Sequence, residues 1–287
     1  MTQFCAIAPT AFLDEFAEGR PAHLLLAHLV EESSEYRNWY INHKNRYPES
    51  TYILDNSCFE RYKAGLPMYE SGKLIELAKT VDADYAVLSD YPAEAGIKTI
   101  EAAQQLAPEF LNADIGTFFC PQSKIGELDD LIATFKWATS DQGNRLIDYI
   151  GLSILAIPNA FGVERSSQLQ RYCSRARFMD MLQDAGVLYE ASLNGQKMHC
   201  LGMLDGYREI DLLRPWLNYI DTWDSSSPVW AGLNGIAYDT SPTGLINGKF
   251  ELEVDFSMST DEVHPSKVLL AHNNLDKIDT LLAKYVL

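Results

Sequence analysis

Aspartates stand at the ends of several apolar, β-rich runs of this sequence. Asp55 ends YILD, Asp90 ends YAVLSD, and Asp221 and Asp224 lie in YIDTWD. Paired carboxylates suit substitution at a sugar carbon, where one acts as nucleophile and the other as general acid and base. A single aspartate at such a position is more often the cap of a following helix or loop. Several in the same relative position predict a carboxylate pocket, provided that the fold brings the run ends together.

The runs that carry these aspartates alternate with amphipathic, helical stretches such as 71–82 and 127–138. Near-continuous apolar runs are typical of parallel strands covered on both faces, so the alternation predicts an α/β fold. Seven runs, with one more near either end, favour a (β/α)8 barrel of the TIM type, in which the carboxyl ends of the strands converge on the active site. A doubly wound open sheet is the alternative. The runs span residues 23–30, 51–56, 83–91, 115–122, 147–154, 197–204 and 219–225.

Two stretches interrupt this rhythm. Residues 155–196 form a long crossover, and residues 228–258, rich in Gly, Pro and Asn, predict a loop and a hairpin inserted after the seventh run. The tail from Lys267 predicts an amphipathic closing helix. No shift in composition divides the chain, so residues 1–287 are expected to form a single domain.

Composition restricts the classes of protein that fit. No run of about 18 apolar residues is present, so no membrane span is expected, and the N-terminus lacks the basic start of a signal peptide. The five cysteines are scattered without a CxxC pair, which indicates a reducing, cytoplasmic setting. The net charge of −17, from 40 acidic and 23 basic residues, argues against a nucleic-acid partner unless bases cluster locally.

Eight segments, in order along residues 50–287, resemble the tRNA-guanine transglycosylase superfamily. No single motif is specific, and the ordered set carries the resemblance. The first four are LDNSCFE (54–60), similar to D-S-G-G-F/Y-Q, VLSDYP (87–92), similar to F-D-E-C, FFCPQS (118–123), similar to V-Q-G-G, and YIGLSI (149–154), similar to I-G-G-L-A-V. The others are HCLGMLDGYREIDLL (199–213), similar to L-M-G-V-G…D-L-L, YIDTWDSSSP (219–228), similar to G-I-D-M-F-D-C-V-L-P, the hairpin segment 244–256, and LLAHNNLDKIDTLL (269–282), similar to the terminal E-H-N-L helix.

The resemblance implies roles for particular residues. Asp224 matches the nucleophile, Asp55 the general acid and base, and Asp90 the group that binds the Watson–Crick edge of guanine. Gln122 would bind the base through its amide, and Phe59 would stack on it. The other residues that the resemblance places at the base are Asn56, Gly151, Leu152, Ser153, Leu201 and Gly202.

The chain departs from the family pattern in two segments. The C-x-C-x-x-C zinc segment is missing, and His272 occupies the place of the zinc-binding histidine without cysteine partners, so neither a metal nor a zinc subdomain is expected. Residues 229–234 replace the T-R-S-G-R segment that helps to grip tRNA. Both departures resemble the shorter DNA guanine transglycosylases that insert 7-deazaguanines, including those encoded by bacterial viruses. Leu152, where the family commonly has Gly, leaves the incoming base unassigned.

This branch implies a ping-pong exchange of guanine in DNA for a 7-deazaguanine of the preQ0 type, without a cofactor. Asp224 would attack C1′ while Asp55 protonates the leaving guanine, which gives a covalent glycosyl–enzyme. The target must be flipped out or single-stranded. Phe59, Phe119 and Trp223 are candidate stacking surfaces, with core packing as the alternative.

The expected partners are DNA and a free 7-deazaguanine base, and a homodimer stays open. Four arginines within 13 residues are candidate phosphate contacts, although an ordinary solvated helix face explains them equally well. They are Arg165, Arg171, Arg175 and Arg177.

Three alternatives keep the carboxylates but change the function. The chain could exchange bases in tRNA, or serve as a non-catalytic RNA-binding subunit, which the presence of both Asp55 and Asp224 opposes. It could also be an unrelated barrel hydrolase of sugars or nucleosides, and only that enzyme would turn over free nucleosides without a polymer.

Overall fold

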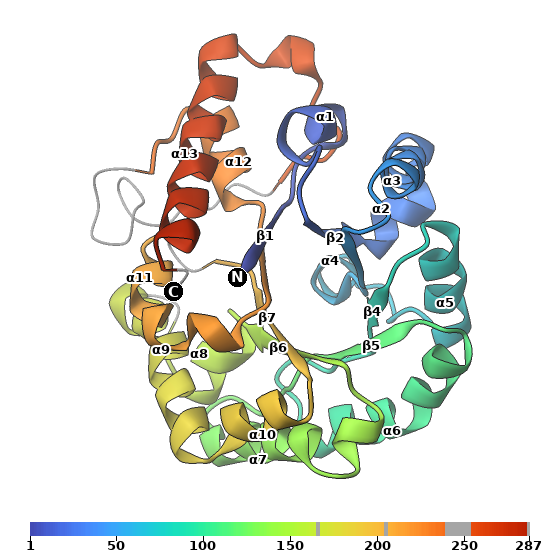
Figure 1. The fold of residues 1–287 in the computed structure, drawn as a ribbon, viewed down its shortest axis with the longest axis vertical. Coiled ribbons are helices and arrows are strands. Elements are labelled where there is room, and N and C mark those ends of the chain that lie inside the picture. The colour runs from blue at the N-terminus through green and yellow to red at the C-terminus, as the bar shows by residue number, and fades with distance from the viewer. Residues whose placement is uncertain (165–166, 204–205, 239–253, 286–287) are drawn as a thin grey trace.

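A nearly closed ring of parallel strands forms the centre of the molecule. The computed structural model describes residues 1–164, 167–203, 206–238 and 254–285. The strands are hydrogen-bonded in the order β1-β8-β7-β6-β5-β4-β3-β2, and β1 lies beside β2 so that the sheet nearly closes (Figure 1). The fold is the predicted α/β (β/α)8 barrel of the TIM type. The strands are β1 (Gln3–Ala6), β2 (Ala22–Leu26), β3 (Thr51–Asp55), β4 (Tyr85–Val87), β5 (Gly116–Phe119), β6 (Tyr149–Ser153), β7 (Lys197–Leu201) and β8 (Thr222–Ser225).

Each of the seven predicted runs contains one strand, and the eighth strand is β1 at the N-terminus. From β2 to β8, neighbouring strands are consecutive in the chain, and β8 pairs with β1. This order excludes the doubly wound alternative, because that arrangement reverses strand order within an open sheet. The strand predicted over residues 23–30 is longer than the observed one, because β2 ends at Leu26. Its second half begins α2, and the chain turns at Ala27.

Helices surround the barrel (Figure 1). The helical predictions for 71–82, 127–138 and the tail are confirmed as α5, α7 and α13. Within the described residues, no helix combines the length and the apolar character needed to cross a membrane. The α-helices are α1 (Leu13–Phe16), α2 (Ala27–Glu32), α3 (Ser34–Arg46), α4 (Cys58–Lys63), α5 (Ser71–Thr80), α6 (Gly96–Asn112), α7 (Leu128–Thr139), α8 (Ala156–Ala160), α9 (Gln168–Asp184), α10 (Val187–Leu193), α11 (Glu209–Leu213), α12 (Ser227–Leu233) and α13 (Pro265–Lys284).

The segment after β8 differs from its prediction as a loop. Residues Ser227–Leu233 form α12, because Pro228 lies at a helix start, where it needs no backbone donor, and the following apolar residues are buried. The hairpin predicted within 244–256 falls largely on residues 239–253, which lie outside the described part of the chain.

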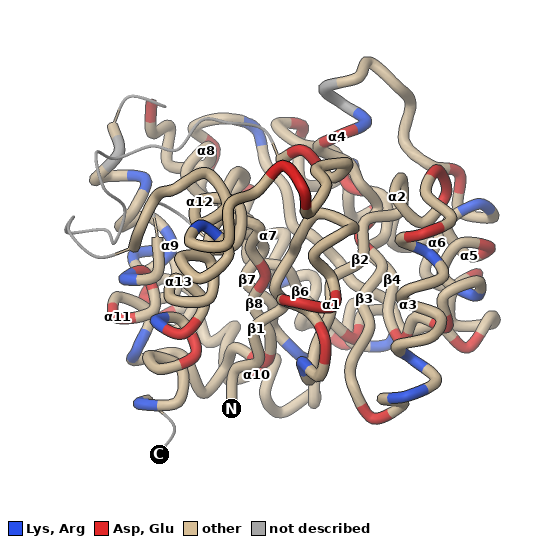
Figure 2. The backbone as a smooth tube through the Cα atoms, turned by 90° about the horizontal axis from the view of Figure 1, so that it is seen from above, with Lys and Arg blue, Asp and Glu red and all other residues tan. Residues whose placement is uncertain are grey.

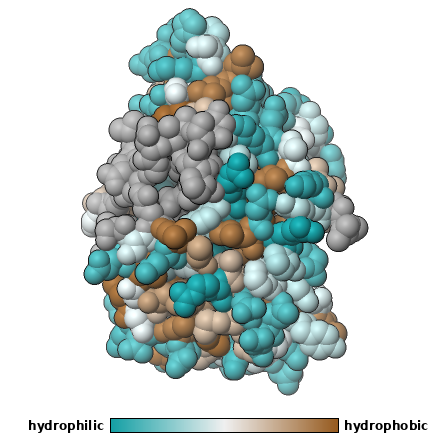
Figure 3. All heavy atoms as spheres, turned by 90° about the vertical axis from the view of Figure 1, so that its left-hand side faces the viewer, coloured by the Kyte–Doolittle hydropathy of each residue, from teal (hydrophilic) through white to brown (hydrophobic). Residues whose placement is uncertain are grey.

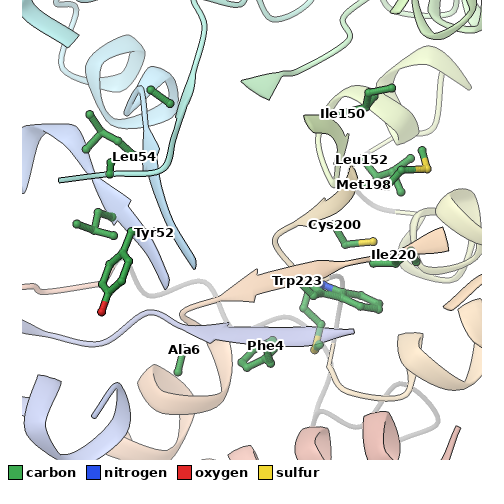
Figure 4. Close-up of a cluster of buried hydrophobic side chains, with 14 of the residues drawn as sticks. Phe4, Ala6, Tyr52, Leu54, Ile150, Leu152, Met198, Cys200, Ile220 and Trp223 are labelled. Carbon is green, nitrogen blue, oxygen red and sulfur yellow. The ribbon is translucent and has the colours of Figure 1, made fainter. Parts of the chain in front are cut away.

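Side chains alternate along each strand between the barrel interior and the layer under the helices. The interior cluster includes Cys5, Leu24, Ile53, Phe118 and Tyr149. Figure 4 shows residues of the outer layer, which come from β1, β3, β6, β7 and β8 and from Ile220 just before β8. This two-residue period decides which strand residues can reach a site inside the barrel.

Two aromatic residues considered as stacking surfaces belong to the outer layer. Phe119 packs on Trp137 with ring centroids 5.2 Å apart, and Trp223 is fully buried among outward-facing side chains (Figure 4). For Phe119 and Trp223, core packing is therefore the correct alternative, because both side chains point away from the barrel axis.

The contact between α12 and α13 requires a glycine. A Cβ atom added to Gly232 would lie 2.2 Å from the Cα and 2.3 Å from the backbone nitrogen of Ala271. We predict that Gly232→Ala destabilises the fold by about 3 kcal/mol, the upper end for an overpacked core, because two backbones must separate. Urea unfolding followed by circular dichroism measures this change.

Gly72→Ala is the matched control, since Gly72 lies in α5 and a Cβ there would meet nothing within 4 Å. This control should be neutral or stabilising by up to about 1 kcal/mol, from helix propensity. Equal unfolding midpoints for the two variants would show that α12 and α13 are not packed this closely.

Candidate active site

The carboxyl ends of the strands form one mouth of the barrel, at the upper edge of Figure 2, where α4 and α8 follow β3 and β6. Asp55 and Asp224 lie at the ends of β3 and β8, and Asp90 follows β4. Asp221 instead precedes β8 and accepts a 2.9 Å hydrogen bond from the Met198 backbone N–H. Three of the four aspartates that the sequence singled out are therefore on the mouth side.

Asp224 is held through one of its two carboxylate oxygens. Its Oδ1 accepts hydrogen bonds from His199 Nε2 at 2.8 Å and from the backbone N–H of Gly202 at 3.0 Å. No described residue donates a hydrogen bond to Oδ2. The side chain is only 8% exposed, and the two hydrogen bonds on Oδ1 fix the orientation of the carboxylate.

Gly202 can donate to Asp224 because of its backbone conformation. Its φ of +70° lies in the left-handed region, and a Cβ there would come within 2.6 Å of Ile154. The carbonyl of Gly202 accepts from the Trp223 indole at 2.8 Å and from Arg175 Nη2 at 3.1 Å. These two donors fix the peptide that follows Gly202 and thereby the turn that supplies its N–H.

Arg175, one of the predicted phosphate contacts, is buried behind the turn that contacts Asp224. It is 0% exposed, its Nη2 also donates to the Leu201 carbonyl at 3.0 Å, and its Nε lies 3.4 Å from Glu209. Its guanidinium also lies 5.3 Å from the centre of the Trp223 ring. An arginine enclosed in this way cannot contact a phosphate, so the prediction for Arg175 is wrong. It supports the turn whose Gly202 N–H donates to Asp224.

The other predicted phosphate contacts divide by position. Arg177 is exposed on α9 and packs over Phe161 at 4.6 Å, and Arg171 is partly exposed on the same helix. Arg165 lies outside the described residues. The side of the molecule that carries α9 mixes hydrophilic and hydrophobic residues (Figure 3), and Lys and Arg are dispersed among Asp and Glu (Figure 2). Phosphate contact by Arg171 and Arg177 stays a prediction.

A second hydrogen-bonded cluster joins three consecutive strand ends. Asp90 accepts from Asn56 Nδ2 at 2.9 Å on one oxygen and from Gln122 Nε2 at 2.6 Å on the other. Asn56 also donates to the Leu88 carbonyl at 2.8 Å. Asn56, Asp90 and Gln122, predicted separately as base-binding residues, are thus brought together. Burial raises the pKa of Asp90, while the hydrogen bonds from Asn56 and Gln122 lower it.

Asp55 lies in a strained turn at the end of β3. Its Oδ2 accepts from the Ser57 N–H at 2.8 Å, and Asn56 Oδ1 accepts from the Cys58 N–H at 2.9 Å. Ser57 has a φ of +54°, which costs energy for a residue with a Cβ, and its hydroxyl contacts His28 Nδ1 at 2.9 Å. The side-chain hydrogen bonds hold the turn and so set the position of Asp55.

The ionisation of Asp55 is coupled to the other acids. Burial raises the pKa of Asp55 well above its ordinary value, and the negative charges of Glu60, Asp224 and Asp90 raise it further. The hydrogen bond from Ser57 acts in the opposite direction. A carboxyl group in this environment retains its proton to higher pH than an exposed aspartate, as a general acid requires.

The remaining predicted base-binding residues differ in what they offer. Gly151 faces the interior, where a Cβ would lie 2.7 Å from the Phe118 ring, and the Leu201 side chain packs against the same interior cluster. Ser153 accepts hydrogen bonds from the backbone N–H groups of residues 155 and 156. Leu152 points outward into the helix layer (Figure 4), so only its backbone could serve a base. Phe59, on α4, is 47% exposed.

His199 is the site residue that sequence reasoning missed. It lies on β7 between Met198 and Cys200, which face the outer layer, so its side chain points into the barrel. The available signal was a histidine at an inward position of an otherwise apolar run. Its partner, Asp224, is 25 residues away in the chain, so only the register between β7 and β8 reveals the contact.

His272 contacts two residues of α1. It pairs with Glu15 and packs on Phe16 with ring centroids 4.9 Å apart. In the part of the chain that the structure describes, no three His, Cys, Asp or Glu side chains are grouped to hold a metal ion.

Comparison with known proteins yields no family. No family model matches the chain, and no curated protein matches it. Among solved structures, it is similar to triosephosphate isomerase from Bartonella henselae, with 10% identity and a TM-score of 0.44 over 72% of this chain and 79% of that one. A protein from Aquifex aeolicus VF5 gives 10% identity and a TM-score of 0.48 over 98% and 93%. Neither similarity bears on function.

The support that Arg175 gives the site leads to a stability prediction. Arg175→Ala should destabilise the fold by about 3–5 kcal/mol, because it leaves Glu209 buried without this partner and frees two backbone carbonyls. Arg177→Ala, on the same helix but exposed, should change stability by less than about 1 kcal/mol. Urea unfolding of both variants tests the assignment, and a small loss for Arg175→Ala would contradict it.

The raised pKa of Asp55 predicts a pH-dependent stability difference. The unfolded chain ionises Asp55 near pH 4, whereas the folded chain keeps the proton to higher pH, so the folded state loses stability as pH rises through that window. Asp55→Asn should therefore match the parent protein at pH 4 and become progressively more stable than it above that pH, by at most about 1.4 kcal/mol per pH unit.

Unfolding titrations between pH 4 and 9 measure this difference, with the exposed Asp276→Asn as control. A constant offset between the Asp55→Asn variant and the parent protein at all pH values would contradict the raised pKa.

Proposed function

We propose that this chain is a base-exchange glycosyltransferase that replaces guanine in DNA with a 7-deazaguanine of the preQ0 type. The observation that carries the proposal is a carboxylate fixed through Oδ1 at the mouth of the barrel, together with a second carboxyl group at the same mouth whose pKa is raised. Asp224 and Asp55 fill these positions, the same two residues for which the family resemblance implies nucleophile and general acid.

Asp224 is suited to form a covalent intermediate. Because its Oδ1 is held by His199 and Gly202, the carboxylate cannot rotate freely, and Oδ2 is the oxygen for attack on C1′. Prior orientation of a nucleophile lowers the entropic part of the barrier. The product would be a glycosyl ester of Asp224.

Asp55 supplies the proton traffic that the exchange needs. In the first half-reaction its proton goes to the leaving guanine, and in the second it takes a proton from the incoming base. The negative charge of Asp224 raises the pKa of Asp55 and disappears when the ester forms. Ester formation therefore lowers the pKa of Asp55. This change favours the carboxylate form of Asp55 before the second half-reaction and keeps its two protonation states close in energy.

The Asn56–Asp90–Gln122 cluster is suited to bind a guanine edge. An ionised carboxylate has about four acceptor positions, and Asn56 and Gln122 occupy two of those on Asp90. The others could accept from N1–H and the exocyclic amine of guanine, which 7-deazaguanines share. The amide groups keep Asp90 in place for either base.

The choice of DNA rests on the sequence departures, since the zinc segment and the arginine segment that grips tRNA are both missing. Incubation with labelled guanine and either single-stranded DNA or tRNA separates the two polymers. We expect label to enter DNA, and entry into tRNA alone would transfer the same chemistry to the other polymer.

Trapping the intermediate tests the nucleophile. With single-stranded DNA and 9-deazaguanine, the parent protein should form an adduct that survives denaturation, whereas Asp224→Ala should form none. Exchange should fall by about 10⁴-fold or more in Asp224→Ala, the order seen when a covalent nucleophile is removed.

Asp276→Asn, on the outer face of α13, is the control and should retain full exchange. An adduct that persists in Asp224→Ala would overturn the assignment of the nucleophile. Release of base from free nucleosides without polymer would instead indicate a hydrolase.

A further inference from the structure

His199 is a buried histidine whose two ring nitrogens both have partners inside the barrel. Nε2 contacts Asp224 Oδ1 at 2.8 Å, and Nδ1 contacts Thr222 Oγ1 at 2.7 Å. Thr222 Oγ1 in turn lies 3.2 Å from the Tyr149 hydroxyl. The rings of Phe118 and Tyr149 pack edge-on to the imidazole at 5.4 and 6.5 Å. The imidazole therefore has a fixed position and orientation.

The chemistry of the partners decides where one proton lies. A carboxylate only accepts hydrogen bonds, so Nε2 must carry the proton in the contact with Asp224. Thr222 can donate to Nδ1 or accept from it, and either arrangement keeps Nε2 as the donor. A carboxylate–histidine contact of this length in a buried site is a charge-assisted hydrogen bond.

We propose that His199 is a positioning residue that acts mainly on the second half-reaction, by stabilising Asp224 as it leaves the sugar. This inference rests on the proposed function, because it presupposes a glycosyl ester on Asp224. It adds a role for a histidine that the family resemblance did not assign.

The charge on Asp224 changes in both steps of the exchange. First, an Oδ2–C1′ bond forms, the C1′–N9 bond breaks with its electron pair moving to guanine, and Asp55 donates a proton to that base. Then N9 of the incoming base loses its proton to Asp55 and attacks C1′, and the Oδ2–C1′ bond breaks with its pair returning to Asp224. Negative charge thus leaves the carboxylate in the first step and returns to it in the second.

A donor on Oδ1 has opposite effects on these two steps. The hydrogen bond that Nε2–H donates is stronger when the acceptor is a carboxylate than when it is the carbonyl oxygen of an ester. It therefore gains strength in the transition state that releases Asp224 and loses strength in the one that consumes it. Removing the donor should therefore slow the release of Asp224 from the sugar. Ester formation should slow less, because Asp224 without this hydrogen bond is a better nucleophile.

The experiment measures the two half-reactions separately in single turnovers on single-stranded DNA. The variants are His199→Leu, which removes the donor, His199→Gln, which keeps an N–H at a similar reach, and Thr222→Val, which removes the support of Nδ1. His23→Gln is the control, because His23 is a buried strand histidine that packs against Tyr52 and His43, in the layer outside the barrel.

We expect His199→Leu to slow release of the sugar to the incoming base by about 10- to 100-fold, the range for a hydrogen bond to a charged group. Formation of the adduct should slow less, so that adduct accumulates during turnover. His199→Gln should restore most of the release rate, Thr222→Val should lie between the two, and His23→Gln should match the parent protein.

Two outcomes would overturn the inference while the proposed function stands. One is equal slowing of both steps in His199→Leu, and the other is unchanged kinetics. If His199→Leu does not fold, the ratio of the two rates in Thr222→Val decides in its place, and an unchanged ratio overturns the inference. Absence of any adduct with the parent protein would instead overturn the proposed function, and this inference with it.

Discussion

The candidate site depends on the two hydrogen bonds that hold Asp224 Oδ1. One donor, His199, comes from inside the barrel, and the other, the Gly202 N–H, comes from the turn above β7. Both exist because β7 and β8 are neighbouring parallel strands in a register that pairs His199 with Thr222. A shift of this register by one residue would turn Asp224 into the helix layer, since side chains alternate between the two faces.

Most of the groups that donate hydrogen bonds to the carboxylates of the site are uncharged. Amide groups of Asn56 and Gln122 hold Asp90, and backbone N–H groups hold Asp55 and Asp224. Such donors fix a carboxylate without neutralising it, so the acids still interact with one another. The raised pKa of Asp55 follows from this choice together with burial. A salt bridge to Asp55 would have had the opposite effect.

Arg175, which is buried near the site, donates to backbone carbonyls and not to these carboxylates. Arg175 donates to the carbonyls of Leu201 and Gly202, which holds the turn that presents a donor to Asp224. Its helix, α9, belongs to the long crossover between β6 and β7. The outer layer thus supports the site from behind, through a left-handed glycine that no residue with a Cβ could replace without moving Ile154.

The amino-acid sequence by itself predicted seven of the eight strands, favoured a barrel over a doubly wound sheet, and placed three of the acids at the carboxyl ends of the strands. This was possible because an apolar run followed by an aspartate is a local pattern, and the carboxyl ends of parallel strands meet on one face of such a barrel. The same local reading placed Asn56, Asp90 and Gln122 at separate strand ends, which the structure joins in one cluster.

Only the tertiary structure decided which residues face which layer and which distant groups meet. Arg175 and Arg177 lie two residues apart in the same helix, yet Arg175 is enclosed behind the turn that contacts Asp224, whereas Arg177 is exposed. Trp223 and Asp224 are adjacent, yet they point to opposite faces of the sheet. His199 contacts Thr222 and Asp224 across the pairing of β7 with β8, which no local sequence pattern contains. Helix and strand periodicity explains why the side chains of nearby residues point in different directions. The identity of each side chain's partner follows only from how the elements pack.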